Sequence, residues 1–380
     1  MPAPRCAPGR LLSVGSDRVR AVGTGRRSAR RGLLGRAVLA VAIVALAACG
    51  SDDEGGGVAQ SGNPPTTPTT AATTTTEAGD NSANGAAADD PQAIVDGRPY
   101  AVGQRTATLV DTSRGTQAVP AQGLEEKPDR TIGLIVLYPA GGEGTGDSEP
   151  VTDAPVAEGR FPLLMFAHGW TGNGANLVPT AQRWASAGYV IALPTFPLSR
   201  DNIGFSADLP QQPGDVRFAL DAVLGYAETA GDPLEGHVDA EHIAVGGHSL
   251  GAATALGFLN SCCDDPRVDA VISVSGGPLC CDGGEYPETM PVPVLLVHGG
   301  RDTVVAHASS DFMFDSFGGS VGYLFLPEAD HVSFFGGDDH ELFDQTVVAF
   351  LDTELGLDPD ALNGLADDVA ATGRGTFRVR

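Results

Sequence analysis

Apolar residues occur in short runs along the middle of the chain, and segments with helical spacing separate most of these runs. Short apolar runs predict β-strands, whereas apolar residues at every third or fourth position predict amphipathic helices. The first two runs adjoin without a helix, which predicts an antiparallel start. The later alternation predicts an α/β fold with a mostly parallel sheet of about eight strands, helices on both faces and no large lid. Strands are expected at 107–110, 132–138, 163–167, 189–193, 243–246, 270–274, 294–298 and 323–326, and helices at 175–187, 215–229, 250–260, 306–317 and 340–355.

Residues 1–48 have the pattern of an export signal rather than of a folded segment. Arginines between Arg26 and Arg36 precede the apolar run 37–48, whose 12 residues are too few to span a bilayer. A basic segment, a short apolar core and small residues before the cleavage point are typical of a signal peptide. The end of the run, Leu46-Ala47-Ala48-Cys49, resembles the bacterial lipobox, so we expect a lipid on Cys49. A plain secretory signal with an incidental cysteine is the alternative.

The remaining chain divides into a tether, a folded domain and a tail. Residues 49–92 are rich in threonine, proline and glycine and have almost no large apolar side chains, which predicts a disordered tether. Residues 93–355 are long enough to form one sizeable core and are expected to be the catalytic domain. Residues 356–380 are expected to form a short helix and a frayed C-terminal tail. The domain is therefore expected outside the cell, either lipid-anchored at the outer face of the membrane or secreted.

The charge balance excludes several kinds of partner. The formal net charge is −25, and because nine arginines and one aspartate lie in the first 48 residues, the chain from Cys49 carries 14 basic and 47 acidic groups. Such an excess of acid argues against nucleic-acid binding and against electrostatic docking on anionic lipids. Attachment to a membrane would depend on the covalent lipid. The oligomeric state stays open.

A Gly-x-Ser-x-Gly pattern at Gly247–Gly251 is the strongest chemical signal in the chain. It follows the expected strand 243–246 and opens the expected helix 250–260, and a turn of this kind lifts the hydroxyl of Ser249 clear of the backbone. The pattern alone is weak in a chain with 51 glycines, and a second match surrounds Ser320. Ser320 has a helix before it and a strand after it, which predicts an ordinary loop. The context therefore favours Ser249 as a nucleophile.

A serine nucleophile needs a histidine base and a carboxylate that orients the base. Asp302 comes just after the strand 294–298, and His331 comes just after the strand 323–326, in the order Ser, Asp, His that such sheets use. Asp302 as a helix cap is the alternative for that residue. His298 is expected at a strand end, and the side chain of His248 is expected to point away from the site.

Two backbone N–H groups are candidates for binding the oxyanion. One belongs to Leu250 in the turn, and the other to Trp170 in the glycine-bearing loop after the strand 163–167. The side chain of Trp170 either walls an acyl pocket or fills the core. No cofactor and no metal are expected.

Four cysteines remain after Cys49, in the adjacent pairs Cys262-Cys263 and Cys280-Cys281. Export makes disulfides plausible, whereas adjacent cysteines fit poorly on one tetrahedral zinc ion. Three connectivities are possible. We favour bonds between the two pairs, because 276–291 shows no helical pattern and a covalent link would fasten that crossover.

The chain resembles α/β-hydrolases, and within them the platelet-activating-factor acetylhydrolase/chlorophyllase-like group of esterases, over roughly residues 98–355. The resemblance implies the α/β-hydrolase fold and hydrolysis of carboxylic esters, with Ser249, Asp302 and His331 as the triad. Dienelactone hydrolases are similar but use cysteine in place of Ser249. The matching segments are 103–106, 111–115, 138–140, 166–169, 212–218, 247–251 and 298–302.

The expected function is therefore that of a serine esterase on small or lipid-like esters at the cell envelope. Three alternatives stay open: an acyltransferase using the same triad, a polyester or cutin-type hydrolase, and a non-catalytic envelope binding protein. Polyester hydrolases have methionine where this chain has Leu250, and this chain has no counterpart to their aromatic clamp after the elbow strand.

Overall fold

The computed structural model describes residues 91–144, 147–261, 263–278 and 286–380, and its centre is a ten-stranded mixed sheet. The strand order is β12-β11-β10-β9-β8-β4-β5-β2-β1-β3, and the six strands from β11 to β5 are parallel. β2 is antiparallel to both β1 and β5, so the predicted antiparallel start is confirmed. The strands are β1 Tyr100–Asp111, β2 Arg130–Glu143, β3 Val151–Thr152, β4 Phe161–Ala167, β5 Val190–Thr195, β8 Val238–His248, β9 Ala270–Val274, β10 Val294–Gly299, β11 Val321–Leu326 and β12 Thr376–Val379.

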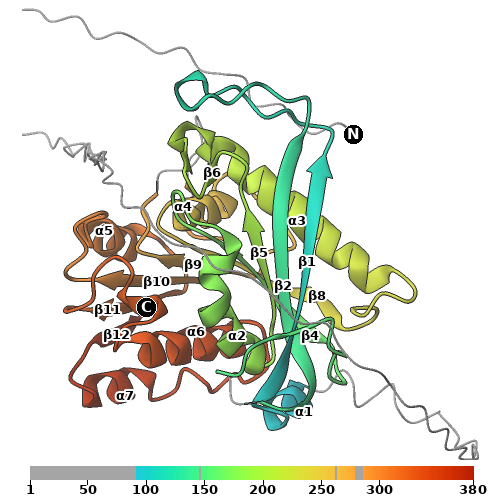
Figure 1. Ribbon diagram of the computed structural model, residues 1–380. Coiled ribbons are helices and arrows are strands. Elements are labelled where there is room, and N and C mark those ends of the chain that lie inside the picture. The colour runs from blue at the N-terminus through green and yellow to red at the C-terminus, as the bar shows by residue number, and fades with distance from the viewer. Residues whose placement is uncertain (1–90, 145–146, 262, 279–285) are drawn as a thin grey trace, which may run out of the picture.

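Helices cover both faces of this sheet, as Figure 1 shows: α2 and α6 lie together on one face, and α3 lies on the other. Every residue of β4, β9 and β10 is buried, since helices exclude water from both faces of the central strands. The protein therefore has the α/β-hydrolase fold. The helices are α1 Pro91–Asp96, α2 Val178–Ser186, α3 Gln212–Glu228, α4 Leu250–Leu256, α5 Ala308–Ser316, α6 His340–Glu354 and α7 Leu365–Ala371.

The segment 197–213, which lies between the predicted strand 189–193 and the predicted helix 215–229, contains ordered structure. It forms the two-stranded hairpin β6 Ser199–Arg200 and β7 Ile203–Gly204, followed by the 3-10 helix Ser206–Gln211. Strands this short bury too little apolar surface to leave a pattern in the sequence. Their order comes from contacts with the rest of the domain.

A buried ion cluster holds that 3-10 helix against the sheet. The guanidinium of Arg130, on β2, donates to both carboxylate oxygens of Asp208 at 3.1 and 2.8 Å and to both of Asp215 at 2.7 and 2.5 Å. Burial opposes the charge of Arg130, but Asp215 and Asp208 outweigh it and raise the pKa of the arginine. Beside the cluster, the hydroxyl of Thr254 on α4 donates to Gln212 at 2.6 Å. The loop, α3 and α4 are therefore connected by polar contacts.

The end of the chain adds an edge strand to the sheet. Residues 356–380 do contain the expected short helix, α7, but β12 follows it and pairs antiparallel with β11. The prediction of a frayed end is wrong for these residues. Phe377 is buried opposite Leu324, and burial of this ring stabilises a strand whose own sequence is polar.

Several predicted features lie outside the described residues. These are the signal peptide with Cys49, the tether up to residue 90, and three of the four paired cysteines (Cys262, Cys280 and Cys281). The lipid site and the disulfide connectivity stay predictions. Within the described part of the chain, every helix is too short or too polar to cross a membrane.

Candidate active site

Ser249 occupies a tight turn between β8 and α4. Its backbone has φ 55° and ψ −116°, a conformation that costs a non-glycine residue free energy and occurs mainly at functional sites. The two motif glycines allow the turn, because the backbone approaches each of them closely. A Cβ on Gly251 would lie 2.2 Å from the carbonyl oxygen of Ala167, and one on Gly247 would lie 2.3 Å from the carbonyl oxygen of Gly251.

Asp302 and His331 meet at the carboxyl ends of β10 and β11. His331 Nδ1 lies 2.7 Å from Asp302 Oδ2, while Asp302 Oδ1 accepts the N–H groups of Val304 and Val305 at 2.8 Å each. Asp302 therefore caps the turn 302–305 and contacts His331 at the same time. It does not cap α5, whose N-cap is His307, so the helix-cap alternative is wrong. Burial works to raise the pKa of Asp302, but donation from His298, His331 and Val305 holds the pKa far below its usual range. The carboxylate is ionised at neutral pH.

His248 contacts His331, contrary to the expectation that its side chain points away from the site. The two rings lie 4.6 Å apart, and His248 Nε2 lies 2.7 Å from the carbonyl oxygen of His331, to which it donates. The expectation failed because the segment after β11, including Phe335, folds back over the end of β8. Burial, reinforced by the charge of His331, lowers the pKa of His248 to about 4, so this ring is a neutral donor. The neighbour of Ser249 thereby supports the backbone of His331.

The loop after β4 lies directly against Ser249. A Cβ on Gly169 would be 3.2 Å from Ser249 Cβ and 3.1 Å from His248 Nδ1, so only glycine allows this approach. His168 holds the loop: its Nδ1 donates to the carbonyl oxygen of Gly169 at 2.8 Å, and its Nε2 accepts the N–H of Phe196 at 3.2 Å. This assignment of protons agrees with a pKa that burial lowers to about 4. The N–H groups expected to bind an oxyanion, those of Trp170 and Leu250, belong to the residues next to Gly169 and Ser249.

The Trp170 side chain lies on the surface and not in the core. It is 45% exposed, and its ring packs on Gly204 of the β6–β7 hairpin, where a Cβ would come within 2.7 Å of the indole Cζ2. Asn173 Nδ2 ties the same loop to the hairpin by donating to Asp201 at 2.6 Å. Val332, next to His331, is 57% exposed. Trp170 and Val332 are therefore exposed apolar side chains that directly follow Gly169 and His331 in the chain.

The second Gly-x-Ser-x-Gly match has the structure that its context predicts. Ser320 is exposed in the loop between α5 and β11, and its carbonyl oxygen accepts the N–H of Val294 at 3.0 Å. Among the described residues, no group of three or more His, Cys, Asp or Glu side chains is placed to hold a metal ion.

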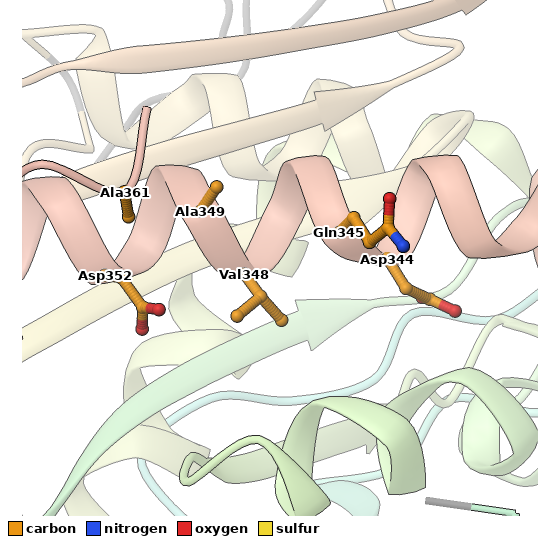
Figure 2. Close-up of a pocket in the computed structure, with 6 residues that line it drawn as sticks. All are labelled: Asp344, Gln345, Val348, Ala349, Asp352 and Ala361. Atoms are coloured by element: carbon orange, nitrogen blue, oxygen red, sulfur yellow. The ribbon is translucent and has the colours of Figure 1, made fainter. Parts of the chain in front are cut away.

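A cavity of about 320 Å³ lies elsewhere, along α6 (Figure 2). Its acidic side chains already have cationic partners: Asp344 pairs with Arg183 and Asp352 pairs with Arg98. Burial raises the pKa of Asp344 to about 6 despite Arg183. This cavity contains none of the predicted catalytic residues. It is lined by Asp344, Gln345, Val348, Ala349, Asp352 and Ala361.

Comparisons with known proteins identify the family and support the fold. A family model described as PETase, PET hydrolase-like, matches residues 99–357. Among solved structures, a ferulic acid esterase from Streptomyces cinnamoneus superposes with a TM-score of 0.52, at 21% sequence identity. That match covers 67% of this chain and 90% of the esterase, and it supports the fold. A search of curated proteins finds no match.

Proposed function

The chain belongs to the PET hydrolase-like family and is a carboxylic ester hydrolase, and on this premise we propose that it acts through the triad Ser249, His331 and Asp302. The observation that carries the proposal is the 2.7 Å contact between His331 Nδ1 and Asp302 Oδ2. The strained Ser249 directly follows β8, whose last residue, His248, contacts His331. An ionised carboxylate on Nδ1 leaves Nε2 free to accept a proton.

In the proposed reaction, His331 Nε2 takes the proton of Ser249 while the serine oxygen attacks the ester carbonyl carbon. The backbone N–H groups of Leu250 and Trp170 stabilise the oxyanion that forms. The C–O bond to the alcohol then breaks, and the leaving alcohol takes the proton from His331. Water attacks the acyl-serine in the second half, which releases the acid and restores the free hydroxyl.

Replacement of the two motif serines tests this proposal. Ser249→Ala is expected to lower turnover of a short-chain p-nitrophenyl ester by up to about 10⁶-fold, because it removes the nucleophile. Ser320→Ala is the matched control and should keep full turnover. If Ser249→Ala retains turnover, the triad is wrong.

Two further measurements separate the alternatives. Failure of the folded protein to react with a fluorophosphonate probe would favour a non-catalytic binding protein. A competing acceptor such as glycerol distinguishes hydrolysis from acyl transfer, since an acyltransferase would form the glycerol ester at the expense of the free acid.

A polyester-type substrate is the second candidate, and the exposed indole of Trp170 favours it together with the family match. An exposed aromatic side chain in the loop next to Ser249 offers a surface on which a chain of ester units could lie. Release of soluble acid from a polyester film tests this candidate. Turnover of small p-nitrophenyl esters without such release would assign the enzyme to small or lipid-like esters.

We also propose that the enzyme is exported and held at the outer face of the membrane by a lipid on Cys49. The lipobox-like sequence before this cysteine and the acidic domain, which would not adhere to anionic lipids, support the proposal. The native protein should partition into a detergent phase, and Cys49→Ser should partition into the aqueous phase. Equal partitioning of both forms contradicts lipid attachment.

A further inference from the structure

A third histidine, His298, lies beside the proposed catalytic carboxylate. It is a residue of β10, four positions before Asp302, and its side chain is fully buried. Its Nε2 lies 2.9 Å from the carbonyl oxygen of Val305 and 3.3 Å from Asp302 Oδ2. Its Nδ1 lies 2.7 Å from the hydroxyl oxygen of Ser310, on α5. Every polar atom of the ring therefore has a partner.

These contacts determine where the ring carries its proton. A carbonyl oxygen and an ionised carboxylate only accept hydrogen bonds, so Nε2 must be protonated to face both. In the neutral ring, Nδ1 then accepts the hydroxyl hydrogen of Ser310. The acceptors at Nε2 thus select the tautomer of His298, and the hydroxyl of Ser310, which can donate, completes it and holds the orientation of the ring.

We infer that His298 is a positioning residue that aligns Asp302 with His331, and that Ser310 holds the ring of His298 in the required orientation. This inference rests on the proposed triad. His298 acts on the carboxylate in two ways. It faces Oδ2 directly, and it binds the carbonyl oxygen of Val305, the residue whose N–H group holds Oδ1.

The alignment has a chemical consequence, because Asp302 Oδ2 must point at His331 Nδ1 when positive charge develops on that ring. Without His298, the turn 302–305 loses its anchor on the side of α5, and Oδ2 loses its second neighbouring donor. A displacement of about 1 Å in a catalytic contact can cost about 100-fold in rate. Loss of a contact that acts through Asp302 should lower kcat and leave KM nearly unchanged.

Four single variants of the full-length protein test the inference. Each is assayed by hydrolysis of a short-chain p-nitrophenyl ester. His298→Leu removes the donor and should lower kcat about 100-fold at similar KM. His298→Gln keeps an N–H group near the position of Nε2 and should recover much of that loss. Ser310→Ala removes the partner of Nδ1, loosens the orientation of the ring and should lower kcat about 10-fold. Ser309→Ala is the matched control, since this neighbour is also buried but donates to the carbonyl oxygen of Gly276 and not to His298.

A double variant separates positioning from mere support of the core. In an Asp302→Asn background, His298→Leu should cause no further loss of kcat, because both residues act through one carboxylate. A purely structural role predicts that the two losses multiply. An unchanged kcat in His298→Leu, or multiplied losses in the double variant, overturns the inference. If His298→Leu does not fold, Ser310→Ala and His298→Gln decide instead.

The failure of this inference is distinguishable from failure of the proposed function. Retained activity in Ser249→Ala would remove the triad itself. An inactive Ser249→Ala variant together with a fully active His298→Leu variant would leave the triad in place and reject the role of His298 alone.

Discussion

Replacement of Asp302 by asparagine changes one atom in the proposed triad and almost nothing in shape. Oδ1 of Asp302 accepts two backbone N–H groups at 2.8 Å, so the amide oxygen of the introduced asparagine must take that position. The amide NH₂ group then faces His331 Nδ1, which lies 2.7 Å from the carboxylate oxygen that this group replaces. A donor at that place forces Nδ1 of His331 to be an acceptor and moves the proton of the ring to Nε2.

The cost of this change follows from the tautomer. A His331 ring with its proton on Nε2 is unable to accept the proton of Ser249, and the negative charge that stabilises the imidazolium is gone. Loss of both effects in a serine triad costs about 10⁴-fold in kcat, which corresponds to about 5.4 kcal/mol of transition-state stabilisation. The effect on KM should be small, because the substrate does not touch this carboxylate.

The measurement is the steady-state hydrolysis of a short-chain p-nitrophenyl ester, with folding checked by thermal unfolding. Asp311→Asn is the matched control: Asp311 also accepts from a histidine, His307, at 2.9 Å, but on α5 and outside the site. The control should keep its kcat. If Asp302→Asn keeps more than about a tenth of the wild-type kcat, the proposed tautomer control by this carboxylate is refuted.

Three other substitutions test features around the site. Arg130→Met leaves the buried Asp208 without its cation and Asp215 with Arg114 alone, and it should lower the free energy of unfolding by about 3–5 kcal/mol, measured by urea denaturation. A loss below about 1 kcal/mol contradicts the buried cluster. Asp344 ionises with a pKa of about 6 in the fold, against 3.8 when exposed. The fold therefore favours the protonated carboxyl and gains stability at low pH, and this contribution is lost as the pH rises from about 4 to 6. The stability of the wild type relative to Asp344→Asn should therefore fall by about 3 kcal/mol across that interval, and parallel pH profiles would refute this. Gly204→Ala should displace the Trp170 ring and shift the tryptophan fluorescence, because the added Cβ would overlap the indole. It should raise KM about 10-fold with little change in thermal stability. An unchanged KM shows that the ring does not contact substrate.

Much of the fold follows from local patterns in the sequence. The central strands are continuous apolar runs, and β9 is found at its predicted residues 270–274. The elements that the sequence did not reveal are short and polar, such as the β6–β7 hairpin and β12. Their stability comes from partners distant in the chain, such as Leu324 opposite Phe377, and a local pattern contains no information about such partners.

The sequence alone determined the order of strands and helices, and it selected Ser249, Asp302 and His331 as candidates, because the ends of parallel strands meet at one edge of a sheet. Only the tertiary structure decided which other side chains support that site. His248 and His298 look alike in the sequence, as single histidines at strand ends. The fold places one ring against His331 and the other beside Asp302. The physical reason is that a hydrogen bond depends on distances of a few tenths of an ångström between atoms far apart in the chain, and only packing of the whole domain sets those distances.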